Sequence, residues 1–215
     1  MQAREFLIFD TDLTRDISTA SPVKQWTRRA FLPAGIAAAA SVGLLVQRRS
    51  AIVEARAVAQ VTHGTPGEVT IANFSNDGKE LGSETIAKIV KTDGEWLHQL
   101  GKNSYDIARE ADTEMPYSGV SWNEHADGVY RCICCDTALF SSKTKFDSGT
   151  GWPSFYASIA KENILEADDD SLGIRRTEVK CMRCEAHLGH VFNDGPEPTG
   201  LRYCMNSAAM RFAKA

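Results

Sequence analysis

The sequence predicts a mainly β protein whose carboxyl-terminal half is held together by a bound metal ion. After Pro116, short apolar runs alternate with clusters of Gly, Asp, Asn and Ser, which is the spacing of a β-rich core with tight turns. Two Cys-x-x-Cys pairs, separated by 45 residues, lie in this same half. Such pairs are typical of a four-cysteine metal site, which would fasten two distant turns to each other.

Length and charge limit the class of protein. The chain has 215 residues, 43% of them hydrophobic, which is enough for one domain and a tail but not for two large domains. From Gln60 onward there are 16 Lys and Arg against 23 Asp and Glu, a formal charge of -7. No nucleic-acid partner is expected, because phosphate contacts need a basic face.

The first 59 residues are expected to be an export signal region. The segment TRRAFL (Thr27–Leu32) and the apolar run Ala34–Val46 resemble a twin-arginine signal, with Arg28 and Arg29 as the recognised pair. A small-x-small site favours cleavage after Ala59. We therefore expect a periplasmic protein.

An uncleaved membrane anchor and a buried helix are the alternatives for this run. The 17 residues from Ala30 to Val46 are mostly alanine and include Pro33. They fall short of the roughly 20 strongly apolar residues that a stable membrane span needs. Contact with a membrane is expected only if the signal is retained.

Residues 60–91 are predicted to be a linker and an N-terminal arm. The stretch Gln60–Glu68 contains a proline and two glycines, and the β-prone Val69–Phe74 is followed by a turn-like SNDG. Thr92 and Glu95 then have the spacing of a helix capping box, and a second short helix is predicted over Ser104–Glu110. We place the start of the main domain, 92–215, at this box.

Four cysteines have the pattern of a closed metal site. Cys132, Cys135, Cys181 and Cys184 would complete the tetrahedral four-sulfur shell that structural zinc prefers, with no position left for water or substrate. Iron is an alternative metal, and redox dithiols or two disulfides are alternative states of the same pairs. Cys134 lies inside the first pair and competes as a ligand.

Cys204 is the candidate nucleophile among the remaining thiols. It lies in RYCMNSAAM (Arg202–Met210), whose pattern suggests a strand close to the core. A thiol becomes reactive when cationic or hydrogen-bonding groups stabilise its thiolate, and Arg202, His187 and His190 are candidates for that role. Trp152 either lines a pocket or belongs to the core, and the histidines are otherwise ordinary core or surface side chains. The acidic run Asp168–Asp170 is expected to be a solvated turn.

The ordered motifs resemble the B-type methionine sulfoxide reductase family, which acts on the R epimer of the sulfoxide. The resemblance covers roughly Thr92–Phe212. The motifs are PYSG (Pro116–Gly119), GVYRC (Gly128–Cys132), DSGTGWPSF (Asp147–Phe155), RRTEVKC (Arg175–Cys181) and AHLGHVFNDGPEPTGLRYCMNSAAM (Ala186–Met210), together with the two cysteine pairs.

The resemblance implies two antiparallel sheets with a few flanking short helices, and a zinc ion away from the active site. It implies that Cys204 attacks the sulfoxide sulfur and becomes a sulfenic acid. His190 would protonate the sulfoxide oxygen or bind it through water, with His187 and Asn206 assisting. Trp152 would hold the methyl group of the substrate, an oxidised protein.

The chain departs from the family at Thr150, where many members have a resolving cysteine. The sulfenic acid would then be reduced directly by a thioredoxin-like protein or another thiol, or else be resolved by Cys134. Two other functions compete with the enzyme. One is a zinc-ribbon binding module in which Cys204 is a buried small residue, and the other is an exchange protein that uses Cys-x-x-Cys as a dithiol.

Overall fold

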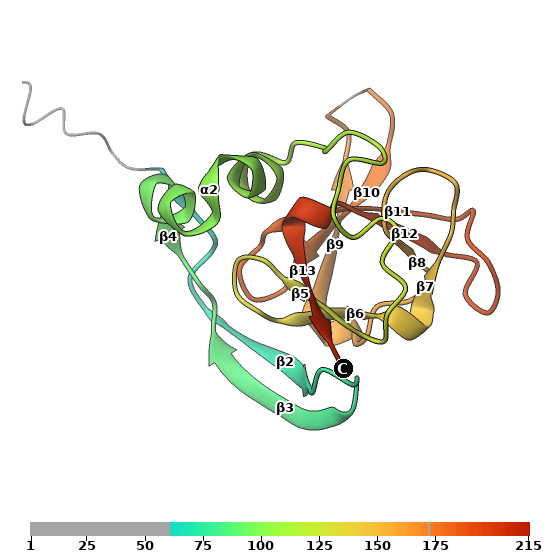
Figure 1. Cartoon of the computed structure of the whole chain (residues 1–215). Helices are drawn as coiled ribbons and strands as arrows, with labels where there is room; N and C mark the ends of the chain where they lie inside the picture. Colours follow the sequence, from blue (N-terminus) through green and yellow to red (C-terminus); the bar gives the residue numbers. More distant parts are fainter. Residues whose placement is uncertain (1–60, 172) are drawn as a thin grey trace, which may run out of the picture. The chain divides into compact units, whose positions relative to one another are not determined.

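Two antiparallel sheets form the centre of the part of the chain that the computed structural model describes, residues 61–171 and 173–215 (Figure 1). The larger sheet has the strand order β7 (Lys145–Phe146), β8 (Ser154–Phe155), β12 (Arg202–Met205), β11 (His187–Phe192), β10 (Arg176–Cys181) and β9 (Ile164–Asp169). The smaller has the order β13 (Met210–Lys214), β5 (Gly128–Cys132) and β6 (Ala138–Ser141). The predicted mainly β fold is confirmed, and the predicted signal region lies outside the described residues.

Two further pairs of strands precede these sheets. β2 (Glu68–Phe74) and β3 (Glu80–Ala87) form a hairpin, and β1 (Thr62–His63) pairs with β4 (Lys91–Thr92). The side-chain amide of Asn163, the residue before β9, connects the β2–β3 hairpin to the larger sheet. It accepts a hydrogen bond from Ala72 N and donates one to Ala72 O, both at 2.8 Å. The predicted strand over Val69–Phe74 is confirmed, whereas the boundary at residue 92 stays a prediction.

The helix α2 (Asp93–Glu110) begins at the predicted capping box. Thr92 Oγ1 accepts from Glu95 N at 3.3 Å, and the Glu95 carboxylate accepts from Thr92 N at 2.8 Å. Gly101 has φ 71° and ψ 166°, which interrupts the helix and divides it into two helical segments. In the part of the chain that the structure describes, no helix is both long and apolar enough to span a membrane.

Aromatic side chains from both sheets share one core. Phe155 of β8 stacks on Phe140 of β6, with ring centroids 4.5 Å apart, and meets Tyr130 of β5 edge-on at 4.9 Å. Tyr203 of β12 packs on Phe140 at 5.6 Å. Side chains alternate along a strand, so Cys204, the residue after Tyr203, points to the opposite face of the larger sheet. This core therefore fixes the strand that presents the candidate nucleophile.

Among the described residues, the connections range from tight turns to the long segment 111–127, and they include three single-turn helices. These are η1 (Ser142–Thr144), η2 (Lys161–Asn163) and η3 (Ser207–Ala209). η3 directly follows the Cys204 strand, with Asn206 as the residue before its first turn. Anything that holds η3 in place therefore also fixes the end of β12.

Candidate active site and metal centre

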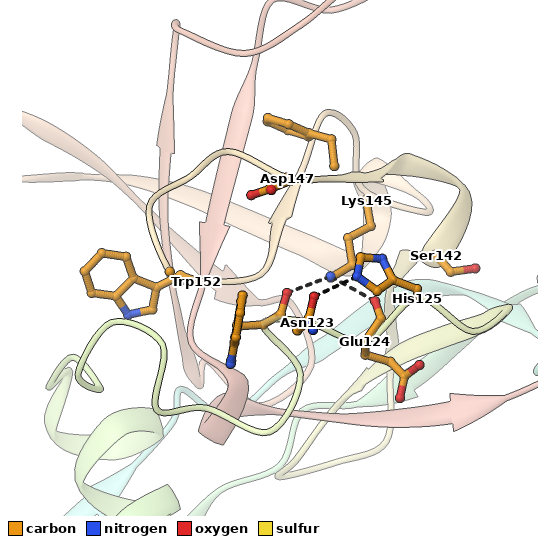
Figure 2. A pocket seen from close by; sticks show the side chains of 10 residues that line it. Asn123, Glu124, His125, Ser142, Lys145, Asp147 and Trp152 are labelled. Atoms are coloured by element: carbon orange, nitrogen blue, oxygen red, sulfur yellow. Dashed lines mark hydrogen bonds between the residues drawn. The ribbon is translucent and has the colours of Figure 1, made fainter.

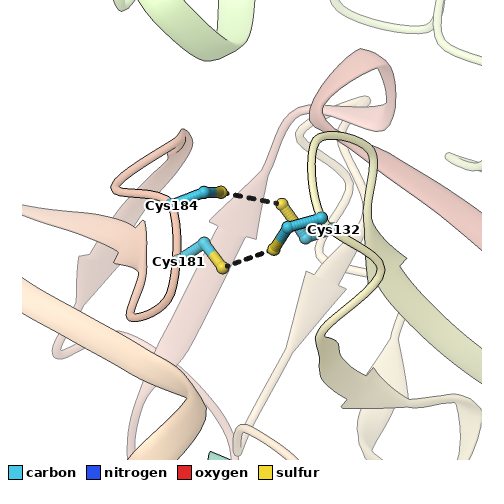
Figure 3. Close-up of side chains that lie close together, drawn as sticks. Cys132, Cys181 and Cys184 are labelled. Atoms are coloured by element: carbon cyan, nitrogen blue, oxygen red, sulfur yellow. Dashed lines mark hydrogen bonds between the residues drawn. The ribbon is translucent and has the colours of Figure 1, made fainter. Parts of the chain in front are cut away.

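The two Cys-x-x-Cys turns have the same backbone geometry. In the first, Asp136 N donates to Cys132 O, and in the second, Glu185 N donates to Cys181 O, both at 2.9 Å. Asp136 and Glu185 have φ values of 67° and 57°, the left-handed conformation that closes each turn. Figure 3 shows the two turns facing each other, with the sulfurs between them.

The four sulfurs converge on one point. All lie within 4.8 Å of one another, with Cys132 Sγ 3.6 Å from Cys184 Sγ and Cys135 Sγ 3.5 Å from Cys181 Sγ (Figure 3). A tetrahedral ion with metal–sulfur bonds of about 2.3 Å requires sulfurs about 3.8 Å apart, close to these distances. A disulfide requires about 2.05 Å, and all six cysteines are free. The predicted four-cysteine metal site is therefore confirmed, and Cys134 is not part of it.

Cys204 lines a separate cavity of about 190 Å³ together with Trp152, His190 and Asn206. The register of the larger sheet brings these groups together, because Cys204 on β12 lies directly opposite His190 on β11 and Ser154 on β8. The structure therefore joins three of the predicted site residues to the candidate nucleophile. The four metal-site cysteines are not among the residues that line this cavity.

The Cys204 thiol is held in its neutral form in the resting protein. Burial raises its pKa, and hydrogen bonding to Thr150 Oγ1 at 3.9 Å, together with Arg202 and Ser154, offsets this rise only in part. The Arg202 guanidinium donates twice to the Asp194 carboxylate, at 2.8 and 2.9 Å. Arg202 is thus less available to the thiol than the sequence suggested.

His190 has a carboxylate partner that the sequence did not indicate. Its Nε2 lies 2.7 Å from Asp169 Oδ2, which also binds Arg176 at 2.6 Å. Burial lowers the pKa of His190, and Asp169 opposes this by favouring the imidazolium. Asp169 belongs to β9, and its side chain is 14% exposed. The predicted solvated turn over Asp168–Asp170 is therefore wrong for Asp169, because pairing with β10 turns its carboxylate toward Arg176.

His187 lies beside this cavity but does not line it. A register shift between β10 and β11 lets His187 and His190 meet, with ring centroids 5.4 Å apart, although they are three residues apart on a strand. His187 Nδ1 is 2.6 Å from Glu178 Oε1. Burial raises the pKa of Glu178, but hydrogen bonds from His187 and Lys180 outweigh it and leave the pKa lowered. His187 therefore packs against the His190 ring from outside the cavity.

Glu114 forms hydrogen bonds that connect Trp152, Asn206 and the first turn of η3. Its carboxylate accepts from Ser207 N at 2.5 Å and Ala208 N at 3.0 Å, the first turn of η3. Its backbone oxygen accepts from Trp152 Nε1 at 3.0 Å, and its N–H donates to Asn206 Oδ1 at 3.1 Å. The role of Glu114 could not be recognised from the sequence, because every one of these partners is at least 38 positions away in the chain.

The fold and the two sites define a class of protein, namely a β-rich protein with four cysteines placed to bind a metal and a separate cavity lined by a free thiol. The chain belongs to the SelR domain family, whose pattern matches residues 100–214. It is similar to proteins named peptide methionine sulfoxide reductase MsrB. That of Herminiimonas arsenicoxydans is 55% identical over 125 residues, which cover 58% of this chain and 91% of that protein. That of Thiobacillus denitrificans is 53% identical over 122 residues, 57% and 92% of the two chains. The family resemblance read from the motifs is confirmed.

Proposed function

We propose that this protein is a peptide-methionine (R)-S-oxide reductase that repairs oxidised methionine in proteins. One observation carries the proposal. Cys204 lies directly opposite His190 in the larger sheet, and Trp152 lines the same cavity. A thiol, a proton donor and an aromatic surface therefore face one space. A sulfoxide needs these three groups, since its sulfur is attacked, its oxygen is protonated and its methyl group is apolar.

The first step transfers oxygen from the substrate to Cys204. Cys204 Sγ attacks the sulfoxide sulfur, the substrate S–O bond breaks, and the oxygen ends on Sγ as a sulfenic acid. The substrate sulfur gains two electrons and leaves as methionine, while the Cys204 sulfur loses two. Because the resting thiol is neutral, its proton must leave as attack proceeds.

His190 supplies the proton that this step needs at the oxygen. With Nε2 bonded to Asp169, Nδ1 is the ring atom left for the sulfoxide oxygen. His190 gives a proton to the oxygen and regains one from the Cys204 thiol, so that the number of protons balances. Asp169 acts as a positioning residue, because it fixes the ring and stabilises the imidazolium.

Regeneration uses an external thiol. Two thiol groups of a thioredoxin-like protein or a small thiol reduce the sulfenic acid to the free Cys204 thiol, releasing water and forming one disulfide. Thr150 lies beside Cys204 Sγ, at the position from which a resolving thiol would act, but its side chain has a hydroxyl group and no thiol. Direct reduction is therefore favoured over resolution by Cys134, which is buried within the first metal-site turn.

Zinc is the metal proposed for the four-cysteine site. Cys132, Cys135, Cys181 and Cys184 provide an all-sulfur shell of the right size and leave no open position, which suits a structural ion. The ion would fasten β5 to β10 and supply no chemistry to Cys204. Bound metal should be one zinc per chain by elemental analysis of the purified protein.

Export to the periplasm by the twin-arginine route is also part of the proposal. The supporting observation is TRRAFL followed by a weakly apolar run and a small-x-small site at Ala57–Ala59. Cell fractionation tests it: Arg28→Lys with Arg29→Lys should keep the protein in the cytoplasm. A membrane-bound protein in the unchanged chain would instead indicate a retained anchor.

The reaction is tested by turnover of single epimers. Purified protein, residues 60–215, is given dithiothreitol and a peptide that contains either R- or S-methionine sulfoxide, with Cys204→Ser as control. Consumption of the R peptide alone, lost in the variant, is the expected result. Folded, metal-loaded protein without turnover would refute the proposal and favour a binding module.

A further inference from the structure

A second cavity lies directly beside the Cys204 cavity. Its volume is about 240 Å³, and Trp152 lines both cavities. Figure 2 shows Trp152 at one end of it and Lys145 and His125 at the other, with Asp147 on the loop that borders it. Because Trp152 contributes to the lining of both cavities, one extended substrate segment can reach both.

The lining of this cavity contains three aromatic side chains and a carboxylate, Asp147. Trp122, Phe146 and Trp152 contribute three aromatic side chains to the lining. Asp147 Oδ1 accepts from Gly149 N at 2.9 Å, and Oδ2 makes no hydrogen bond among the described residues. Aromatic faces together with a carboxylate are the surroundings that bind a lysine or arginine side chain in water.

The lining already contains one cation, Lys145, on which the charges of Glu124 and Asp147 both act. Lys145 Nζ donates to Trp122 O and Glu124 O, both at 2.9 Å (Figure 2). Two carbonyl oxygens thus hold the ammonium, and the Glu124 carboxylate adds a second negative charge to the lining. The lining carries two carboxylates and one ammonium, so these three groups together give it a net negative charge.

We propose that this cavity is a subsite for a cationic side chain, lysine or arginine, that neighbours the oxidised methionine in the substrate. The proposal rests on the proposed function and names the substrate sequences that the site favours. In an extended peptide, each residue advances the chain by about 3.3 Å. A side chain one or two positions from the oxidised methionine can therefore extend beyond Trp152 into the second cavity. An acidic neighbour would be repelled by Asp147.

A peptide scan tests this subsite. Peptides with one R-methionine sulfoxide carry a single lysine at each of the two positions on either side, against alanine and glutamate at the same positions. One lysine position should raise kcat/KM about fivefold over alanine, the size expected for a partly exposed cation contact. Added salt should reduce this preference, because exposed charges are screened.

Two variants separate the charge of the subsite from general effects. Asp147→Asn keeps the oxygen that binds Gly149 N but removes the charge, so the ratio of kcat/KM between the lysine and alanine peptides should fall to about one. Glu162→Gln, which removes a charge from the exposed surface of η2, should retain the preference. Equal rates for lysine and alanine at every position, or a preference that survives Asp147→Asn, would overturn the proposal.

Failure of the proposed function has a different signature. It would abolish turnover of every peptide, the alanine peptide included. Binding of the lysine and alanine peptides, followed by tryptophan fluorescence, then still decides the subsite. Tighter binding of the lysine peptide that is lost in Asp147→Asn supports it, and equal binding overturns it.

Discussion

Replacing Glu114 by glutamine should loosen the active site without touching the reacting atoms. The carboxylate of Glu114 accepts two N–H groups from η3, and its backbone holds Trp152 and Asn206. In Glu114→Gln, one acceptor oxygen becomes an amide NH₂ that faces a donor, so one of these two hydrogen bonds is lost and the other loses its charge. A hydrogen bond to a charged group contributes about 1.5–3 kcal/mol, so the variant should be destabilised by about 2 kcal/mol.

Thermal unfolding and peptide kinetics measure this effect. For a domain of this size, about 2 kcal/mol corresponds to a fall in Tm of roughly 4–8 °C. Because Trp152 and Asn206 lose a fixed anchor, kcat/KM should fall about tenfold at a temperature where the variant is fully folded. Glu162→Gln is the matched control and should change neither quantity. A Glu114→Gln variant with unchanged Tm and unchanged kcat/KM would refute the role given to Glu114.

Three further predictions concern the partners of Cys204 and the metal. Asp169→Asn should lower kcat about tenfold. Because Asp169 raises the pKa of His190, and the protonated form is present only below that pKa, the alkaline limb of the pH profile should move to lower pH in this variant; a limb that stays in place would argue against the pair. Thr150→Cys should let the introduced thiol condense with the Cys204 sulfenic acid, since the two side chains lie 3.9 Å apart, and a thiol titration after one turnover should find two fewer thiols than before. Cys135→Ser should abolish metal binding and cooperative unfolding, because a structural zinc contributes on the order of 10 kcal/mol, and a metal-free variant with a normal melting curve would contradict this.

The metal site could be predicted from the sequence because its geometry is local. Each Cys-x-x-Cys turn places two thiols by itself, and only the meeting of the two turns depends on the fold. The capping box at Thr92 was predictable for the same reason, since its partners are three residues apart. Cys204 was a candidate nucleophile from the sequence itself, whereas the roles of Trp152 and His190 came from the family resemblance. The register of β8, β11 and β12 explains why Cys204 and His190 face one cavity.

The supporting carboxylates could not be predicted, because their partners are distant in the chain. Asp169 lies in an acidic run that is typical of a solvated turn, and only the pairing of β9 with β10 directs it toward His190. The hydrogen bonds of Glu114 to η3 join residues 93 and 94 positions apart. The contact between His187 and His190 depends on a register shift that no strict two-residue alternation predicts.

The most direct test of the mechanism is a single turnover without any reductant. Metal-loaded protein is mixed with excess R-methionine sulfoxide peptide, and reduced peptide is counted together with the mass of the Cys204 peptide after trapping of sulfenic acid. The proposed mechanism predicts one reduced peptide per protein and one oxygen atom on Cys204, with neither product in Cys204→Ser. Reduced peptide formed without oxygen on Cys204, or formed by the Cys204→Ser protein, would contradict it.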